Sequence, residues 1–224
     1  MSHDPVLLDE RLWFPAASRA AAGGRRAGLV AVGGDLSVER LVLAYRQGIF
    51  PWTDNPLTWW SPQPRAILPL AGFHVSRTLA RVLRQGRFTV SFDRSFPAVI
   101  EGCAAPAPGR TNTWISPSFL AGYTRLHEAG YAHSVECWQG ARLVGGVYGV
   151  AVGGLFAGES MFHRVSEASK VALCHLVRRL AERGFGLFDL QMLTPATRQL
   201  GGVTIPREEY LRRLARVVDQ PVKF

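Results

Sequence analysis

The chain has 224 residues and a formal charge of +9, and 47% of its residues are hydrophobic, 10% aromatic and 19% charged. This composition allows one substantial domain with a small appendage, and it excludes disorder for most of the length. The positive charge favours a polyanionic partner, such as nucleic acid, an acidic membrane or a phosphate-rich cofactor. An arginine-heavy composition caused by genome bias is the alternative explanation.

The sequence gives no sign of secretion or membrane insertion. Residues 1–15 lack a basic region followed by an apolar run, as a secretory signal would have. The longest uncharged stretch, 143–158, contains six glycines and is shorter than the roughly 20 residues that a spanning helix needs. The three cysteines are odd in number and far apart, which fits reduced thiols. We therefore expect a cytoplasmic protein without a metal site.

The first 65 residues are dense in Gly, Pro and Trp and predict a small N-terminal α/β subdomain over 1–65. Within it, the sequence predicts one short helix over 37–47, with Gly48 placed to end it. The stretch 50–65 contains four prolines and three tryptophans, which favour a packed aromatic loop over long regular elements.

Beyond residue 65, apolar periodicity predicts alternating helices and strands. The expected order is a helix over about 75–84, a strand at 89–93, a helix at 96–104, a helix from Ser116 to Gly130, strands at 133–139, 143–150 and 155–162, a long helix that ends at Gly184, a strand at 187–191 and a last helix from Pro206. The predicted order therefore indicates an α+β fold, with two helices, an antiparallel meander, a long helix and a return strand. They are typical of a GNAT-like acyltransferase core, here over 66–224, with a mostly antiparallel sheet flanked by helices.

Nine short segments occur together along the chain: GLVAVGGDLS (28–37), AYRQGIFPW (44–52), WWSPQPRAIL (59–68), AHSVECW (132–138), LVGGVYG (143–149), GESMF (158–162), ASK (168–170), FDLQ (188–191) and IPREEY (205–210). In this order they resemble the leucyl/phenylalanyl-tRNA–protein transferases, over roughly residues 10–216. The resemblance implies transfer of Leu, Phe or, less readily, Met from charged tRNA to a protein's N-terminal Arg or Lys. This marks the acceptor for N-end-rule degradation. It implies a monomer and no cofactor.

The resemblance places a catalytic pair at Asp189 and Gln191. Side chains two residues apart in a strand point to the same side, so both are expected to face one cleft. A relay has been proposed for the family, in which the Asp polarises the Gln to accept a proton. Because a neutral amide is a very weak base, we instead expect Gln191 to orient the amine, with the proton passing to the ribose hydroxyl or water. The alternative is that both residues have only structural roles, with Asp189 capping a turn and Gln191 standing at the end of a strand.

Glu159 lies in an otherwise uncharged strand, where an inward-facing carboxylate should be paired or functional. We group it with the catalytic residues and expect it to bind the donor's α-ammonium or the acceptor's basic side chain, the donor side being favoured. An exposed acid on an edge strand is the alternative. Its neighbours Gly158 and Ser160 are assigned to substrate binding.

Specificity for an apolar side chain that is unbranched at Cβ calls for a narrow apolar pocket, in which one methylene is worth about 1–3 kcal/mol. Trp114, Val147, Phe156 and Met161 are the candidates to line it, with ordinary core packing as the alternative for each. Family members often carry Met at the position of Val147, so the resemblance implies a roomier pocket here.

The resemblance also associates Tyr45, Trp52 and Tyr123 with the substrate cleft. There an aromatic ring can stack on the terminal adenine of the tRNA for roughly 1–3 kcal/mol. Simple burial is the alternative for Trp52.

The helix face that carries Arg77, Arg81 and Arg84 is the candidate for contact with tRNA phosphates. Seven arginines and only two acids occur between Arg65 and Arg110. Such contacts supply affinity without reading the sequence. A solvated helix face is the alternative.

One departure from the family and two rival functions remain. After FDLQ the family usually has a His-Leu pair, whereas Ala196 and Thr197 stand at about that place here.

A coenzyme A-dependent N-acetyltransferase would need a glycine-rich loop before the long helix, and residues 163–170 contain no glycine. A non-catalytic RNA-binding protein would need only the arginine face and the aromatic residues.

Overall fold

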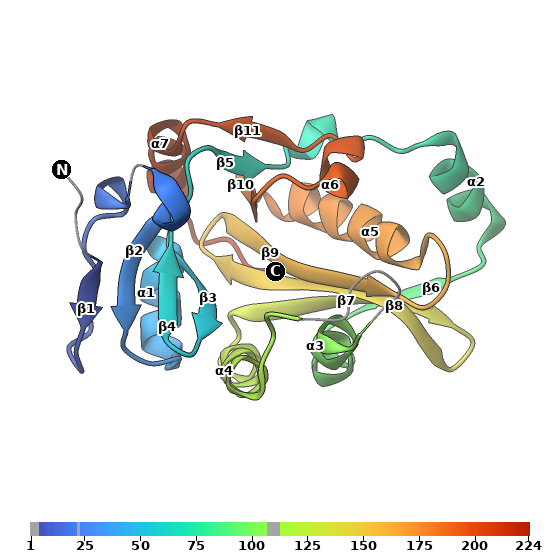
Figure 1. Cartoon of the computed structure of the whole chain (residues 1–224). Helices are drawn as coiled ribbons and strands as arrows, with labels where there is room; N and C mark the ends of the chain where they lie inside the picture. The colour runs from blue at the N-terminus through green and yellow to red at the C-terminus, as the bar shows by residue number, and fades with distance from the viewer. Residues whose placement is uncertain (1–4, 22, 107–112) are drawn as a thin grey trace.

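The computed structural model describes residues 5–21, 23–106 and 113–224. A four-stranded sheet lies at one end of the molecule and a seven-stranded sheet fills the rest (Figure 1). The smaller sheet has the strand order β1-β2-β4-β3, and the larger sheet has the order β11-β5-β10-β9-β8-β7-β6.

The first 60 residues form the smaller sheet. Its strands are β1 Val6–Leu8, β2 Leu29–Gly33, β3 Phe50–Asp54 and β4 Leu57–Trp60. β1 runs parallel to β2, whereas β4 pairs antiparallel with both β2 and β3. Helix α1, Val38–Arg46, begins after Ser37, whose side chain accepts a hydrogen bond from the backbone N–H of Arg40. The predicted helix over 37–47 is confirmed.

The stretch 50–65 contains a short hairpin, β3 and β4, where the sequence predicted a packed loop. Its prolines do not prevent this, because Pro51 lies in the edge strand β3 and Pro56 lies between the two strands. Trp59 is fully buried, and its indole N–H donates to the carbonyl of Gly33 at 2.9 Å. The aromatic packing was therefore predicted correctly, but the strands were missed.

The larger sheet contains one parallel pair in an otherwise antiparallel arrangement. Its strands are β5 Arg65–Ile67, β6 Thr89–Phe92, β7 Ala132–Gln139, β8 Arg142–Val152, β9 Leu155–His163, β10 Leu187–Gln191 and β11 Val203–Ile205. β9 and β10 are parallel, and every other neighbouring pair is antiparallel.

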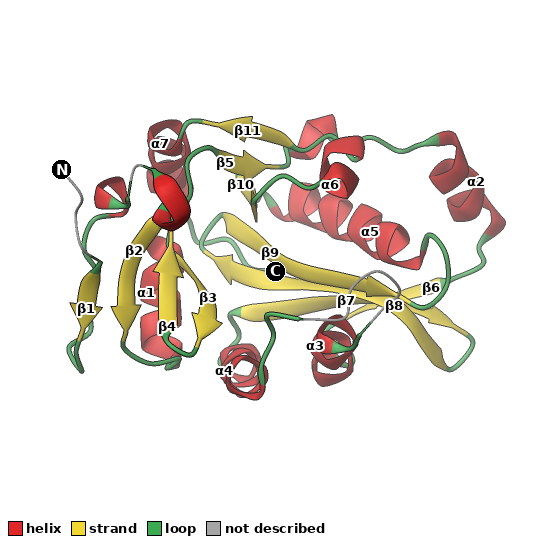
Figure 2. Cartoon of the chain, viewed as in Figure 1, coloured by secondary structure: helices red, strands yellow, loops and turns green. Residues whose placement is uncertain are grey.

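Helices cover both faces of this sheet (Figure 2). The α-helices after α1 are α2 Arg77–Gln85, α3 Phe96–Ala104, α4 Pro117–Glu128, α5 Ala168–Arg183, α6 Pro195–Gln199 and α7 Arg207–Val217, and the short 3₁₀ helices are Ala17–Arg19, Gly24–Arg26 and Leu70–Gly72. One apolar cluster lies beneath α5 and α2, and another lies on the side of α1, α3 and α4. No helix in the described part of the chain combines the length and apolar character needed to cross a membrane.

The predicted α+β class is confirmed, as are the helices and strands predicted beyond residue 65. The sequence missed β5, β11 and α6, which have three to five residues each. The chain passes from one sheet to the other at residues 61–64, between β4 and β5. A single apolar cluster nevertheless includes side chains from both sheets, such as Trp59 and Tyr148. The subdomain boundary near residue 65 stays a prediction.

Candidate active site

The candidate site lies where β9 and β10 separate. The two strands are paired from Leu187 with Leu155 to Asp189 with Ala157. Two residues further along each strand stand Glu159 and Gln191. There the side-chain Nε2 of Gln191 donates a hydrogen bond to Oε1 of Glu159 at 2.7 Å. A hydrogen bond between two side chains thus joins the strands just beyond their last paired residues.

An irregularity in each strand sets the direction of these side chains. On β9, Ser160 opposes Tyr148 and Gly158 opposes Gly149, so Glu159 is the extra residue of a β-bulge. On β10, the register with β5 shifts between Asp189 and Gln191, and Gln191 has a positive φ of 61°. Bulges re-aim side chains and are common beside active sites.

Three hydroxyl or amide groups hold the carboxylate of Glu159. Tyr45 donates to Oε1 at 2.8 Å, Tyr123 donates to Oε2 at 3.1 Å, and Gln191 provides the third donor. The two tyrosine hydroxyls are also 2.6 Å apart. The ion pairs of the described residues do not include Glu159. The carboxylate of this half-buried residue therefore accepts three hydrogen bonds and has no ion-pair partner among the described residues.

Burial raises the pKa of Glu159 to about 7, and the charge of Asp189 acts in the same direction. The hydrogen bonds from Tyr45, Tyr123 and Gln191 oppose this rise. Burial, together with the charge of Glu159, also holds the pKa of both tyrosines well above the usual value. The tyrosine hydroxyls therefore stay protonated at neutral pH and donate hydrogen bonds, and Glu159 is the group of this cluster whose pKa lies near neutral.

Asp189 is fully buried and saturated with donors. Nε and Nη2 of Arg65 donate to its two oxygens at 2.9 and 2.6 Å, and Tyr210 donates to Oδ2 at 3.0 Å. The backbone N–H of Gln191 donates to Oδ1 at 2.8 Å. The prediction that Asp189 and Gln191 both face one cleft is wrong, because the register shift between them breaks the two-residue alternation. Asp189 meets the backbone of Gln191 and not its side-chain amide.

The sequence reasoning missed Arg65 and Tyr210, which enclose Asp189. The signal for Arg65 was a charged residue at the head of the apolar run 65–68. Tyr210 lies in the segment 205–210, but no site role was predicted for it.

The expectation that Tyr45 and Tyr123 stack on an adenine is also wrong. Their side chains are 1% and 0% exposed, so neither ring offers a free face. Their hydroxyls serve Glu159 instead. Trp52 is half-buried and contacts Trp60, with 5.3 Å between the ring centroids, so part of its surface stays accessible.

The four residues predicted to line one apolar pocket do not gather there. Trp114 packs edge-on against Phe119, on the side of α4. Val147, Phe156 and Met161 belong to the cluster beneath α5, on the other face of the sheet. Val147 and Phe156 are 4% and 1% exposed, so they are core residues. Only Trp114 and Met161 are partly exposed.

Gly158 and Ser160 flank the bulge at Glu159, and both are half-buried. A Cβ atom on Gly158 would lie 2.9 Å from the ring of Phe188, so the close approach of β9 and β10 requires glycine here. Ser160 stands opposite Tyr148 in the ladder.

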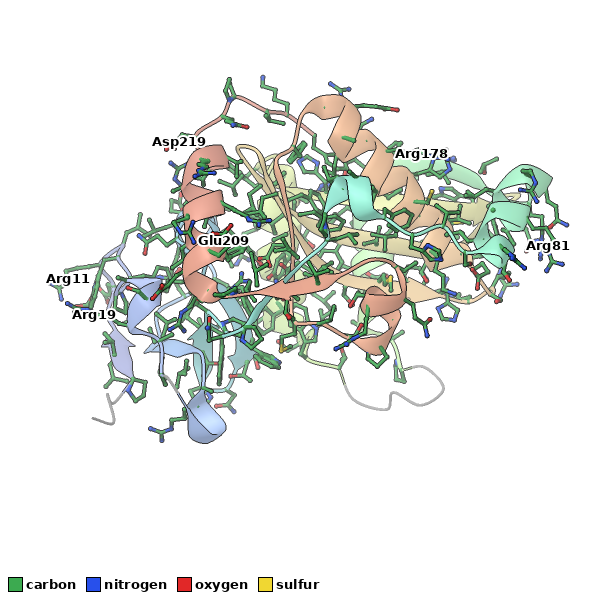
Figure 3. All side chains as sticks on the ribbon, turned by 90° about the horizontal axis from the view of Figure 1, so that it is seen from above. Arg11, Arg19, Arg81, Arg178, Glu209 and Asp219 are labelled. Carbon is green, nitrogen blue, oxygen red and sulfur yellow. The ribbon has the colours of Figure 1, made fainter. Side chains whose placement is uncertain are left out.

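The predicted arginine face exists. Arg77, Arg81 and Arg84 are exposed on α2, at the end of the molecule opposite the smaller sheet. Figure 3 shows Arg81 pointing outward at this end, with Arg178 of α5 at the same end and Arg11 and Arg19 at the other. Residue 110, which closes the predicted arginine-rich stretch, lies outside the described residues.

Residues Ala196 and Thr197, at the departure from the family, lie in the short helix α6. Thr194 and Thr197 form a reciprocal capping box there. The departure therefore gives a capped turn directly after the strand that carries Gln191.

Two open surface hollows lie away from this cluster. One, of about 640 Å³, is lined by Leu8, Asp9, Glu10, Arg11, Gly34 and Asp35. A second, of about 410 Å³, is lined by residues that include Asp35, Asp54 and Arg125. Neither includes Glu159 or Gln191. In residues 5–21, 23–106 and 113–224, no three His, Cys, Asp or Glu side chains are grouped so that they could hold a metal ion.

Comparison with known proteins places this chain among the tRNA-dependent aminoacyltransferases, which are enzymes. The family model described as leucyl/phenylalanyl-tRNA protein transferase matches residues 67–215, and the model of its N-terminal domain matches residues 34–63. The chain belongs to the leucyl/phenylalanyl-tRNA protein transferase family. The resemblance carried by the nine segments is confirmed.

Several relatives match nearly end to end. The leucyl/phenylalanyl-tRNA–protein transferase of Thiobacillus denitrificans is 53% identical over 196 residues, 87% of this chain and 86% of the relative. Those of Solidesulfovibrio magneticus and Azoarcus sp. are 52% and 51% identical, and each match covers 93% of this chain and 84% or 89% of the relative. Among solved structures, L-PGS from Bacillus licheniformis aligns with a TM-score of 0.41 and 13% identity over 68% of this chain and 49% of that chain. That likeness is too remote to support an inference.

Proposed function

We propose that this chain transfers Leu, Phe or, less readily, Met from aminoacyl-tRNA to the α-amino group of an N-terminal Arg or Lys. The product would be marked for N-end-rule degradation, and the enzyme would act as a cytoplasmic monomer. Relatives with this transferase name, about half identical over most of the chain, support the donor and the reaction. The structural observation that carries the proposal is Glu159, a half-buried residue whose carboxylate accepts from three hydrogen-bond donors and forms no ion pair within the described part of the chain.

The reaction needs no ATP, because the aminoacyl ester is already activated. The acceptor's α-amino group has an ordinary pKa of roughly 7.7–8.0, so about a tenth or more of it is neutral at cytosolic pH. Its nitrogen attacks the ester carbonyl carbon and forms the C–N bond, which gives a tetrahedral intermediate. The nitrogen then loses a proton, the C–O bond to the ribose breaks, and the ribose oxygen takes up a proton. The site must hold amine and ester together and stabilise these charges.

Glu159 and Gln191 are the residues that we propose contact the reacting groups. Glu159 lies beside the acceptor amine, which attacks in its neutral form, and the ionised carboxylate takes up the proton that the nitrogen loses once the C–N bond has formed. Nε2 of Gln191 donates its hydrogen bond to Glu159. The side-chain oxygen Oε1 of Gln191 is therefore the atom that accepts a hydrogen bond from the incoming amine. Asp189 acts indirectly, as a positioning residue that holds the backbone N–H of Gln191.

The donor tRNA would be held by surfaces on both sides of this pair. Arg77, Arg81 and Arg84 offer cations to the phosphate backbone. Trp52 and Trp114 are the half-buried aromatic candidates for the terminal adenine and the apolar side chain. The bulge neighbours Gly158 and Ser160 complete the donor side, whereas Met161 packs against the apolar cluster beneath α5, on the opposite face of the sheet. Val147 and Phe156 would act from within the core, by shaping the strands that carry these residues.

We also infer that residues 66–224 form a GNAT-like acyltransferase core. The order of two helices, an antiparallel meander, a long helix and a return strand parallel to the last meander strand supports this assignment.

The proposed function is tested with radiolabelled Leu-tRNA or Phe-tRNA and a peptide that begins with Arg. Label is expected in the peptide and not in a control peptide whose α-amine is acetylated. Label that stays on the tRNA, together with equal affinity for charged and uncharged tRNA, would instead support the RNA-binding alternative. Calorimetry with acetyl-CoA tests the acetyltransferase alternative, for which we expect no binding.

A further inference from the structure

Arg65 is a buried cation that contacts both sheets. Its side chain is 1% exposed. Besides the two hydrogen bonds to Asp189, its Nη1 donates to the carbonyl of Gly48 at 3.0 Å. The guanidinium lies 4.4 Å from the ring centroid of Tyr210 and 4.9 Å from that of Phe50. One side chain thus joins β5 to β10, to α7 and to the segment that follows α1.

The contacts of Asp189 leave little room for a chemical role. Oδ1 accepts from Arg65 Nε and from the backbone N–H of Gln191, and Oδ2 accepts from Arg65 Nη2 and from the hydroxyl of Tyr210. A carboxylate offers about four lone-pair positions, and four donors are present. Burial is the largest influence on the pKa of Arg65 and would lower it, but the charge and hydrogen bonds of Asp189, together with the charges of Tyr210 and Glu159, hold that pKa above the usual value. Arg65 therefore stays a cation beside Asp189 at neutral pH.

We propose that Arg65 is a positioning residue for transfer: with Tyr210 it occupies the oxygens of Asp189, so that Asp189 holds the backbone of Gln191 in place and takes no part in proton exchange with the substrate. This inference rests on the proposed function. It differs from a relay through Asp189, because it assigns proton exchange to Glu159 alone.

The ion pair of Arg65 and Asp189 also contributes to the electrostatic potential at Glu159. The titratable groups that face Glu159 are Tyr45 on α1, Tyr123 on α4, Tyr148 on β8, Asp189 on β10 and Arg65 on β5. The tyrosines are neutral, because burial holds their pKa values well above the usual range. The fixed charges among these groups are therefore Arg65 and Asp189, which have opposite signs. Removing Asp189 alone would leave an unbalanced cation that favours the ionised form of Glu159.

The test is a double-mutant cycle with Asp189→Asn, Arg65→Gln and both together. Each single change leaves a buried charge without its partner, whereas the double variant restores neutrality with two amides. We expect Asp189→Asn to lower the pKa of Glu159 by about one unit, and the added Arg65→Gln to move it back. Carbon-13 NMR of the Glu159 carboxyl measures this without any substrate. A pKa of Glu159 that is the same in the single and double variants would contradict the proposal.

Transfer of label under single-turnover conditions provides the second readout. The double variant is expected to transfer about tenfold faster or more than Asp189→Asn, which corresponds to ~1.4 kcal/mol of coupling. If both variants are folded and equally inactive at every pH, Asp189 itself takes part in proton transfer and the proposal fails. If the unmodified enzyme transfers no label, it is the proposed function that fails, and the NMR titration still decides the role of Arg65.

Arg65→Lys serves as the conservative variant if Arg65→Gln does not fold. Lysine keeps the charge but cannot form the two-pronged contact with Asp189. We expect transfer to slow with KM for the peptide unchanged and with the pKa of Glu159 unchanged. An Arg65→Lys enzyme with the original turnover would show that the fork geometry is not needed and would overturn the proposal.

Discussion

The side-chain amide of Gln191 donates to the carboxylate of Glu159 over 2.7 Å, two residues beyond the last paired residues of β9 and β10. This contact joins Glu159, whose pKa is raised to about 7, to Gln191, the residue that we propose orients the acceptor amine. The site is built from strand ends, and rigid strands hold functional groups more accurately than loops do.

Glu159→Gln is expected to slow transfer by about 10²–10⁴-fold, the usual contribution of a positioned acid or base. The amide keeps the size of the side chain but loses its charge and its ability to take up a proton. Single-turnover transfer of label from Leu-tRNA measures the rate, and filter binding should show unchanged affinity for tRNA. Glu182→Gln, an exposed acid on α5, is the matched control and should transfer at the original rate.

The pH dependence of stability should change in the same variant. The pKa of Glu159 is about 7 in the folded protein, above the ordinary value of 4.5. A raised pKa contributes stability that is fully present below pH 4.5 and is lost as the pH rises through 7. The Tm of Glu159→Gln relative to the unmodified protein should therefore increase from pH 5 to pH 8. A Tm difference that is constant over this range would show that Glu159 titrates normally.

Tyr45→Phe and Tyr123→Phe should each raise the pKa of Glu159 further, because each removes a donor that stabilises the carboxylate. The acid side of the pH–rate profile for transfer would move to higher pH in both variants. Tyr148→Phe is the control, because the buried hydroxyl of Tyr148 has no hydrogen-bond partner among the described residues. It should leave the profile in place and cost no stability.

Arg81→Ala combined with Arg84→Ala should weaken tRNA binding and flatten its salt dependence, by roughly 0.7–0.9 in the logarithmic slope for each lost phosphate contact. Binding measured between low and moderate salt gives this slope. Arg19→Ala, an exposed arginine at the opposite end of the molecule, should change neither quantity (Figure 3). A slope that is unaltered in the double variant would remove α2 from the tRNA surface.

The elements that the sequence predicted well are those with long apolar periodicity. In α5, Leu173, Leu176 and Leu180 mark one buried face, and Gly184 ends the helix in the left-handed conformation. The short strands β5 and β11 were missed because three residues cannot show a period of two. The hairpin of β3 and β4 was missed because its prolines fall at an edge and in a turn.

The candidate site residues were chosen from the family motifs, but these motifs did not predict their contacts. Alternation along a strand predicted one shared face for Asp189 and Gln191, and a register shift has no sequence signature at this length. The partner of Asp189 lies 124 residues away in the sequence, so no local pattern could identify Arg65. Trp114 and Val147 were assigned to one pocket, although they lie on opposite faces of the sheet.

The two matched segments of the family, 34–63 and 67–215, meet beside Arg65, yet they share the site. Tyr45 comes from the first segment and Glu159 from the second, and Arg65 binds the carbonyl of Gly48 from the first. A chimaera that joined the N-terminal segment of one relative to the C-terminal segment of another would have to preserve the hydrogen bonds made by the Tyr45 hydroxyl and by the Gly48 carbonyl. Substitutions at the contacting positions of the two segments are therefore expected to covary. Recombination between distant relatives at this junction should be poorly tolerated.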